Sequence, residues 1–228
     1  MDKPLLVGID IGSTTVKVIA LDAATRKPVF DRYARHNARQ ADTLRSMLVE
    51  MQAAFPEAVF RAAVCGSGGK RIATRIGAHF IQEVVANSIA IQELYNDARV
   101  AIELGGQDAK IVFFYFDAVT GRLMASDMRM NGICAGGTGA FIDEIASLLK
   151  VPVSELNGLA AKGAKVYDIT GRCGVFDKTD IQPLLNQGGS SEAIALSSFQ
   201  AAGKQTIGRL AQGLEVQHPV IFEGRPLT

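Results

Sequence analysis

The sequence lacks three features that would each indicate a particular partner or location. It has no cluster of lysine and arginine and a net charge of only +1, so the electrostatic pattern of a nucleic-acid-binding protein is absent. It has no run of about 18 apolar residues, the length that spans a bilayer. Its N-terminus has no basic stretch followed by an apolar core, so no signal peptide is predicted. A cytoplasmic location is therefore the expectation.

Histidine and cysteine are also scarce, which limits the metal sites that the chain can form. The three histidines lie far apart and match no metal-ligand spacing, so we interpret them as surface or structural residues. They are His36, His79 and His218. In a reducing compartment, the three cysteines are expected to be free thiols or metal ligands rather than disulfides. They are Cys65, Cys134 and Cys173.

The composition that remains is ordinary for a globular protein with a well-filled core. Of the 228 residues, 48% are hydrophobic and 21% are charged. The length fits one large domain or two of about 100 residues each. Strand patterns followed by helix patterns occur twice. They predict an α/β protein of two related halves, residues 1–97 and 98–228, each a mixed sheet with helices on its faces.

The expected elements follow from apolar periodicity and from the positions of glycine and proline. In the first half we expect strands at 4–11, 14–22, 28–35 and 59–65 and helices at 41–54, 70–76 and 84–97. In the second half we expect strands at 99–104, 109–117, 122–129 and 219–223 and helices at 138–149, 153–162 and 190–214. The chain stops after a strand and a glycine turn, where a helix usually follows, so a truncated polypeptide is expected.

The most informative pattern is a short phrase that occurs twice. Residues 7–19 read VGIDIGSTTVKVI and residues 100–112 read VAIELGGQDAKIV. At one fixed offset Asp10 falls on Glu103, and Lys17 falls on Lys110. Each phrase predicts a strand, a glycine turn that can approach a ligand closely, and a returning strand. Two such hairpins facing each other would clamp a polyphosphate and its metal ion.

In the first hairpin each polar residue suits a part of that ligand. Gly12 lets backbone N–H groups approach phosphate oxygens, and Lys17 can place a positive charge on them. Asp10 is placed to hold Mg²⁺ through water molecules. Hydroxyl donors come from Ser13, Thr14 and Thr15. The alternative is an ordinary hairpin with small polar residues in its turn, which the second copy of the phrase disfavours.

The second hairpin supplies the candidates for water activation. Glu103 and Asp108 are candidates for the acid that positions the metal or the attacking water, and Gln107 for the residue that orients that water. Asp108 as a simple turn acid is the alternative. The glycines of this turn are Gly105 and Gly106.

Two further polar residues are interpreted as structural. Lys110 is expected to be a solvated or sheet-edge charge. Asn87 is expected to cap a helix that begins near Ser88.

The pair DIGSTTVK and ELGGQDAK resembles the two phosphate motifs of the superfamily of acetate and sugar kinases, heat-shock chaperones and actin. The resemblance implies two ribonuclease-H-like halves, the actin-like ATPase fold, with ATP in a cleft between them. It also implies a glycine motif near the C-terminus that contacts adenosine. The matching segment is IFEGRPL, with Gly224 as the glycine; Arg225 stands where the superfamily usually has a second glycine.

A glycine-rich segment, NGICAGGTGAFIDE, precedes an apolar-periodic run and predicts a loop that opens a helix. The N–H groups at such a helix start can bind an anion, so this loop is a candidate third contact to nucleotide. Its candidate residues are Gly136, Gly137, Thr138 and Gly139.

Two cysteines lie in glycine-bounded loops rather than in apolar strands. Cys134 comes just before the glycine-rich loop, and Cys173 lies in TGRCGVFDKTDI, ahead of an expected helix start at Lys178. The alternative for each is a buried small hydrophobic residue. Cys65 ends an expected strand and is interpreted as structural.

The combination of CAGGTGAFIDE and RCGVF closely resembles the ATPase activators of 2-hydroxyacyl-CoA dehydratases and the related ATPase subunits of benzoyl-CoA reductase. The resemblance covers essentially the whole chain. It implies a homodimer whose subunits share one [4Fe–4S] cluster, with Cys134 and Cys173 as the matching ligands. ATP hydrolysis would drive one low-potential electron to a CoA-ester dehydratase or reductase. The segment IFEGRPLT is more similar to large activator-like proteins with further domains, which leaves the target open.

Two other functions stay open at this stage. A small-molecule kinase of the same superfamily needs a base aspartate near its substrate, and Asp108 is the one candidate. A non-catalytic nucleotide-sensing scaffold would not need Asp10 and Lys17 intact.

Overall fold

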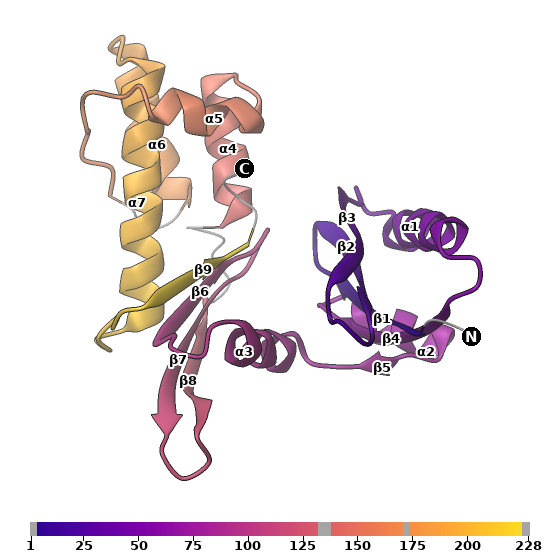
Figure 1. Ribbon diagram of the computed structural model, residues 1–228. Helices are drawn as coiled ribbons and strands as arrows, with labels where there is room; N and C mark the ends of the chain where they lie inside the picture. The colour runs from indigo at the N-terminus through magenta and orange to yellow at the C-terminus, as the bar shows by residue number, and fades with distance from the viewer. Residues whose placement is uncertain (1–3, 132–137, 171–173, 225–228) are drawn as a thin grey trace. The chain divides into compact units, whose positions relative to one another are not determined.

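The computed structural model describes residues 4–131, 138–170 and 174–224, with side chains omitted at 174–177. The chain divides into two compact units, Met1–Ala90 and Ile91–Thr228. Each unit is built around its own sheet (Figure 1). The predicted α/β class with two sheets is confirmed.

The first unit contains a mixed five-stranded sheet in the order β3-β2-β1-β4-β5. Strand β2 pairs antiparallel with both β1 and β3, and β4 pairs parallel with both β1 and β5. The elements are β1 (Pro4–Ile11), β2 (Thr15–Asp22), β3 (Pro28–Arg35), α1 (Gln40–Ala54), β4 (Val59–Cys65), α2 (Gly69–Ile76), β5 (His79–Phe80) and α3 (Glu83–Leu94).

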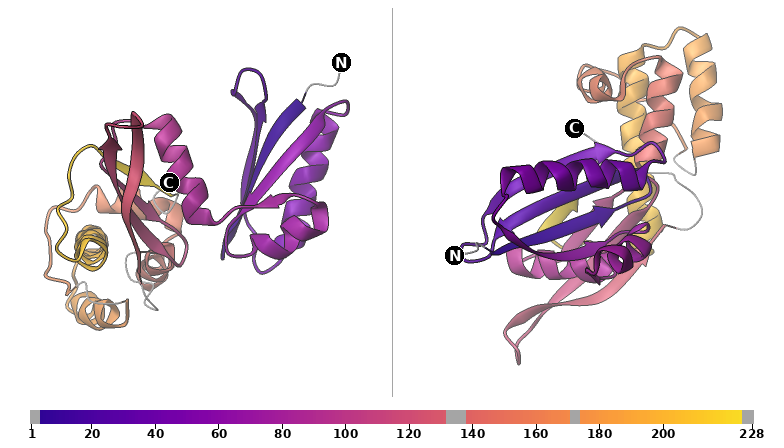
Figure 2. Two further views of the ribbon diagram at one scale, coloured as in Figure 1. Left: turned by 90° about the horizontal axis from the view of Figure 1, so that it is seen from below. Right: turned by 90° about the vertical axis from the view of Figure 1, so that its right-hand side faces the viewer.

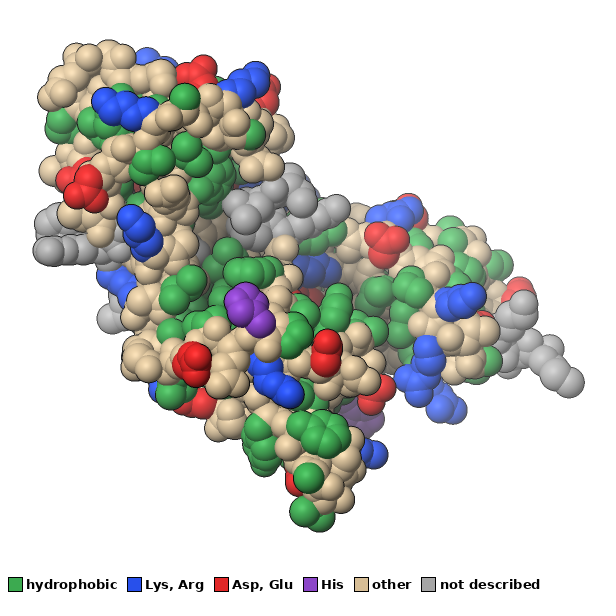
Figure 3. All heavy atoms as spheres, turned by 60° about the vertical axis from the view of Figure 1, so that its left-hand side comes forward, with side chains coloured by type: hydrophobic (Ala, Val, Ile, Leu, Met, Phe, Trp, Pro, Cys, Tyr) green, Lys and Arg blue, Asp and Glu red, His purple; other side chains and the backbone are tan. Residues whose placement is uncertain are grey.

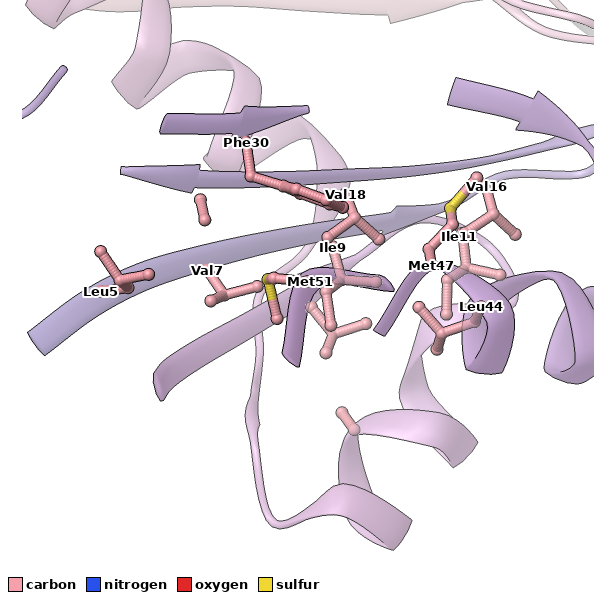
Figure 4. Packing of buried hydrophobic residues seen from close by; sticks show 13 residues of the cluster. Leu5, Val7, Ile9, Ile11, Val16, Val18, Phe30, Leu44, Met47 and Met51 are labelled. Atoms are coloured by element: carbon pink, nitrogen blue, oxygen red, sulfur yellow. The ribbon is translucent and has the colours of Figure 1, made fainter. Parts of the chain in front are cut away.

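The core of this unit lies on one face of its sheet, where α1 and α2 pack (Figure 2). Side chains alternate along β1, so every second residue points to this face. Figure 4 shows these strand residues meeting Leu44, Met47 and Met51 of α1. The strand residues labelled there are Leu5, Val7, Ile9, Ile11, Val16, Val18 and Phe30. Asp10, between two core residues of β1, lies on the opposite face of the sheet.

The second unit contains a four-stranded sheet in the order β8-β7-β6-β9. Strands β6 to β8 are antiparallel, and β9 pairs parallel with β6, so the order and directions repeat those of β3-β2-β1-β4. The elements are β6 (Val100–Leu104), β7 (Ala109–Asp117), β8 (Arg122–Met130), α4 (Gly139–Leu149), α5 (Val153–Ala160), α6 (Gly174–Asn186), α7 (Ser191–Ala211) and β9 (Val220–Glu223).

The long helix α7 belongs to two cores of the second unit. Leu210 and Ala211, near its C-terminus, pack against Val100 and Ile102 on one face of the sheet. Its N-terminal part packs with α4, α5 and α6 in a separate helical cluster. Figure 1 shows α7 running from that cluster to the sheet. The other face of the sheet packs against Ile91 of α3.

Most of the predicted strands and helices are confirmed, with differences in the second half of each unit. Helix α3 begins at Glu83, so Asn87 lies inside it and does not cap it. Helix α6 begins at Gly174 rather than near Lys178. The two-residue strand β5 was not expected.

The structure shows the distribution of surface charge and the hydropathy of the helices. Charges of both signs are interspersed on the face shown in Figure 3. Among the described residues, no helix has the length and hydropathy needed to cross a bilayer.

Candidate functional site

The repeated phrase forms the same hairpin in both units. Asp10 faces Lys17 across β1 and β2, and Glu103 faces Lys110 across β6 and β7. Residues that face each other in an antiparallel pair extend on the same side of the sheet, so each acid can reach its lysine. Lys17 Nζ lies 2.6 Å from Asp10 Oδ2, and Lys110 Nζ lies 3.1 Å from Glu103 Oε2.

The two ion pairs differ in their exposure to solvent. The Lys17 side chain is 44% exposed, whereas the Lys110 side chain is only 6% exposed. The expectation that Lys110 is a solvated or sheet-edge charge is therefore wrong. It lies on the central strand β7 of a sheet whose faces are both covered, and its ammonium group is held by Glu103. Lys17 keeps the accessibility that binding to a ligand requires.

Asp10 has one carboxylate oxygen without a protein partner. Oδ2 accepts the hydrogen bond from Lys17, but no donor among the described residues reaches the buried Oδ1. Gly66, which follows β4 with φ +89°, lies so close that an added Cβ would come within 2.5 Å of Oδ1. A buried carboxylate oxygen costs free energy unless it is bonded. Its position fits a water-mediated contact to a Mg²⁺ ion.

The glycine turns close in the same way in both hairpins. Gly12 N donates to Thr15 O at 2.9 Å, and Gly105 N donates to Asp108 O at 2.8 Å. The predicted ligand residues around these turns differ in burial. Thr15 is buried, Gly12, Ser13, Thr14, Gly105 and Gly106 are half-buried, and Gln107 and Asp108 are exposed. Gln107 and Asp108 are therefore accessible to a substrate or water.

Helix α4 is bonded directly to the second turn. Gly139 N donates to Gly105 O at 2.9 Å, and Ala140 N donates to Gly106 O at 2.8 Å. These are two of the N–H groups that a helix start leaves without a partner in its own helix. Thr138, the N-cap residue, is buried. The start of α4 is thus joined to the second glycine turn by two backbone hydrogen bonds.

Gly224 follows β9 as Gly66 follows β4. Its φ is +104°, and a Cβ there would lie 3.0 Å from the carbonyl carbon of Leu104 and still closer to the carbonyl oxygen. Only glycine fits this backbone conformation and this approach.

Two residues that sequence reasoning treated as structural lie next to the candidate site. Cys65 faces Asp10 in the parallel register of β1 and β4, and His36 is hydrogen-bonded to Gly12. Strand register and loop closure, which no local pattern reveals, bring them there.

Some predicted site residues lie outside the described residues. They are Cys134, Cys173, Gly136 and Gly137. Within the part of the chain that the structure describes, no three His, Cys, Asp or Glu side chains gather as a metal-ligand group.

Comparison with solved structures identifies the class of fold. Component A of (R)-2-hydroxyglutaryl-CoA dehydratase from Acidaminococcus fermentans is similar with a TM-score of 0.83 at 24% identity, covering 96% of this chain and 82% of that one. The activator of 2-hydroxyisocaproyl-CoA dehydratase from Clostridium difficile, with bound ADPNP, gives a TM-score of 0.78 at 24% identity, covering 96% and 79%. The fold is the actin-like ATPase fold, as predicted.

The chain belongs to the BadF/BadG/BcrA/BcrD ATPase family, whose model matches residues 7–225. Among curated relatives, the (R)-2-hydroxyglutaryl-CoA dehydratase activating ATPase of Acidaminococcus fermentans is 26% identical over 219 residues, covering 96% of this chain and 81% of the relative. The resemblance to dehydratase-activating ATPases and the prediction of an ATPase are thereby confirmed.

Proposed function

We propose that this ATPase is an activator that delivers a low-potential electron to a CoA-ester dehydratase or reductase, through a [4Fe–4S] cluster shared by the two subunits of a homodimer. The observation that carries the proposal is the bonding of α4 to the second glycine turn, at Gly105 and Gly106. The proposal is also supported by the activity in the names of its relatives, among them a dehydratase-activating ATPase.

The nucleotide is proposed to bind through both hairpins. Lys17 and the turn at residues 12–15 would contact the phosphates, and Asp10 would hold Mg²⁺ through water. Two observations support this assignment: no described residue donates a hydrogen bond to Asp10 Oδ1, and the Lys17 side chain is accessible. The bound ADPNP of the Clostridium difficile activator supports a nucleoside triphosphate as the ligand.

The second turn is proposed to carry the hydrolytic residues. Glu103 and the exposed Asp108 would position the metal or the attacking water, and Gln107 would orient that water. Lys110 holds one oxygen of the Glu103 carboxylate, which fixes its orientation. Thr138 and Gly139 would complete the surroundings of the phosphates, and Gly224 would contact adenosine.

Cys134 and Cys173 of each subunit are proposed to bind the cluster, four thiolates in all, across a two-fold axis. Thiolate sulfur is the donor that such clusters require, so the chemistry of the two residues fits. The cluster would supply the one-electron redox chemistry. In the sequence Cys134 comes five residues before Gly139, whose N–H is bonded to Gly105. A change in phosphate state would move the second turn, then α4, and with it the segment that bears Cys134.

The nucleotide part is tested by measuring MgATP binding calorimetrically and phosphate release with Asp10→Asn. Because Asp10 acts on the metal through water, we expect a loss of about 10–100-fold in hydrolysis. Asp31→Asn, at an exposed position of the same sheet, is the matched control and should hydrolyse ATP like the wild type. Absence of nucleotide binding by the wild-type protein would refute the proposed function.

The cluster part is tested by anaerobic reconstitution, with iron and sulfide analysis and visible absorbance. Cys134→Ser and Cys173→Ser should each lose the cluster and retain nucleotide binding, whereas Cys65→Ser should retain both. Equal iron content in all three variants would show that the ligands are assigned wrongly. Iron-free wild-type protein that phosphorylates a sugar or acetate would favour a kinase.

A further inference from the structure

His36 lies directly after β3 and is buried, with 5% of its surface exposed. Its backbone N–H donates to Thr14 O at 3.1 Å. Its ring lies against the first glycine turn, where Nε2 is 3.2 Å from Gly12 O. The buried imidazole of His36 is therefore hydrogen-bonded to the turn that is proposed to bind phosphate.

The hydrogen bonds of the ring fix its tautomer. The backbone N–H of Ala38 donates to His36 Nδ1 at 3.1 Å, so Nδ1 carries no proton. In a neutral imidazole the proton then lies on Nε2, which donates to Gly12 O. The ring therefore links two backbone segments, accepting from one and donating to the other.

The segment after His36 is strained in a way that favours this geometry. Asn37 and Ala38 have φ values of 45° and 64°, in the left-handed region that non-glycine residues rarely adopt. Such conformations persist where surrounding contacts hold them. The bond from Ala38 N to the ring is one such contact, and the bond from Arg39 N to His36 O, at 2.7 Å, is another.

The bond to Gly12 O has a consequence for the next peptide group. The peptide between Gly12 and Ser13 is planar and trans, so its N–H points away from its carbonyl. When His36 holds the Gly12 carbonyl on its own side, the Ser13 N–H points to the opposite side. Rotation of this peptide would exchange an N–H donor for a carbonyl oxygen, which repels phosphate.

The second unit repeats the arrangement with a different residue type. Asn131 lies directly after β8, as His36 lies after β3. Its Nδ2 donates to Gln107 O at 3.4 Å, and its Oδ1 accepts from Ala109 N at 2.8 Å. In both units the residue after the third strand thus donates to one backbone group and accepts from another, and its donor reaches a carbonyl of the glycine turn.

We propose that His36 is a positioning residue for nucleotide binding, which keeps the Gly12–Ser13 peptide oriented with its N–H toward the phosphates. The inference rests on the proposed function. His36 does not contact the nucleotide itself; it acts through Gly12.

Two amide variants separate the two bonds of the ring. Glutamine places an N–H donor near the position of Nε2, so His36→Gln should keep the bond to Gly12 O and lose the bond from Ala38. Asparagine places an acceptor near the position of Nδ1, so His36→Asn should keep the bond from Ala38 and lose the bond to Gly12 O. His79→Asn, at an exposed position of the same unit, is the control.

The dissociation constant of MgADP is measured by calorimetry, beside the thermal unfolding midpoint of each variant. Loss of the bond to Gly12 O should weaken MgADP binding about tenfold in His36→Asn, while His36→Gln binds within about threefold of the wild type. His79→Asn should match the wild type. Equal affinity of the Asn and Gln variants, whether unchanged or reduced in step with their stability, would overturn the positioning role. A wild-type protein that binds no nucleotide would instead sink the proposed function.

Discussion

At the scale of single residues, the same acid–lysine pair has two roles. In the first unit Lys17 is partly exposed, and one carboxylate oxygen of Asp10 accepts no hydrogen bond from the residues that the structure describes. In the second unit Lys110 is buried and neutralises Glu103. The sequence pattern predicts that the acid and the lysine of each pair lie on the same face of their sheet, because side chains alternate between the two faces along a strand. It does not give their burial, which depends on the elements that cover each sheet.

Replacing the two lysines should therefore change different properties. Lys110→Met removes the cation that balances the Glu103 carboxylate, whose side chain is only 16% exposed, and should lower the free energy of unfolding by about 3 kcal/mol. Lys17→Met should cost about 1 kcal/mol or less, because its pair is partly solvated, and should instead weaken MgATP binding. Urea unfolding and calorimetry of both variants measure the two effects. A similar loss of stability in both would contradict the assignment.

A second ion pair on the first unit makes its stability depend on pH. Arg32 of β3 is bonded to Glu50 of α1, with Nε 2.9 Å from Oε2. This hydrogen bond lowers the pKa of the Glu50 carboxyl below its ordinary value of 4.5; desolvation opposes the shift and the charge of Arg32 adds to it. Folding thus favours the ionised carboxylate. The contribution is full above the ordinary pKa and is lost as the pH falls through the lower folded-state pKa.

Glu50→Gln should consequently have a lower free energy of unfolding than the wild type at pH 6. The difference between the two free energies should shrink as the pH falls below about 4. Both groups are exposed at the surface, so 1 M salt should also narrow the gap. Urea unfolding of both proteins across this pH range is the measurement. A gap that stays constant with pH would mean that the pair contributes no charge-dependent stability.

At the scale of elements, apolar patterns predicted the longer strands and helix α1. Apart from β5, the strands of both sheets and α1 agree with the predicted bounds within a few residues. The pattern failed where the apolar residues of an element do not form one buried face. In α3, Ile91 is buried whereas Ile89 and Leu94 are exposed, so its apolar residues do not share one buried face. Strand β5, with two residues, is too short to have a period.

A glycine with positive φ follows β4 in the first unit and β9 in the second, the strands that pair parallel with β1 and β6. Gly66→Ala would require a left-handed backbone and bring Cβ within 2.5 Å of Asp10 Oδ1. We expect a loss of about 2–4 kcal/mol, from the backbone strain and the overlap together, and a loss of ATP hydrolysis as Asp10 is displaced.

Gly77→Ala is the matched control for that variant. Gly77 also has positive φ, at +66°, but no atom lies within 4 Å of its added Cβ. It should cost only the conformational part, about 1–2 kcal/mol, and leave hydrolysis unchanged. Chemical unfolding and phosphate release of the two variants make the comparison, and equal losses of both properties would contradict a specific contact at Gly66.

At the scale of the whole molecule, the repeat in the sequence is a repeat of topology. Strands β3-β2-β1-β4 and β8-β7-β6-β9 have the same order and directions. In each unit the first strand of the hairpin, β1 or β6, ends near an acidic residue and is followed by a glycine turn. The thirteen-residue phrases were enough to predict the two hairpins of this repeat, β1–β2 and β6–β7, because that motif is local. The helical cluster of α4 to α7 lies between β8 and β9, where the first unit has α1 alone between β3 and β4. No repeat therefore predicted its packing.

If one nucleotide is held by both hairpins, its binding must protect both units together. Hydrogen exchange with and without MgADP should show slower exchange in peptides that cover residues 12–15 and in those that cover residues 105–108. Because α4 is bonded to the second turn, the start of α4 at Gly139 and Ala140 should also gain protection. Lys17→Met, with weaker binding, should lose the protection at both turns at once, since one ligand causes both. Protection confined to one turn would mean that the nucleotide is bound by a single hairpin, and the proposal that both hairpins hold one ligand would have to be abandoned.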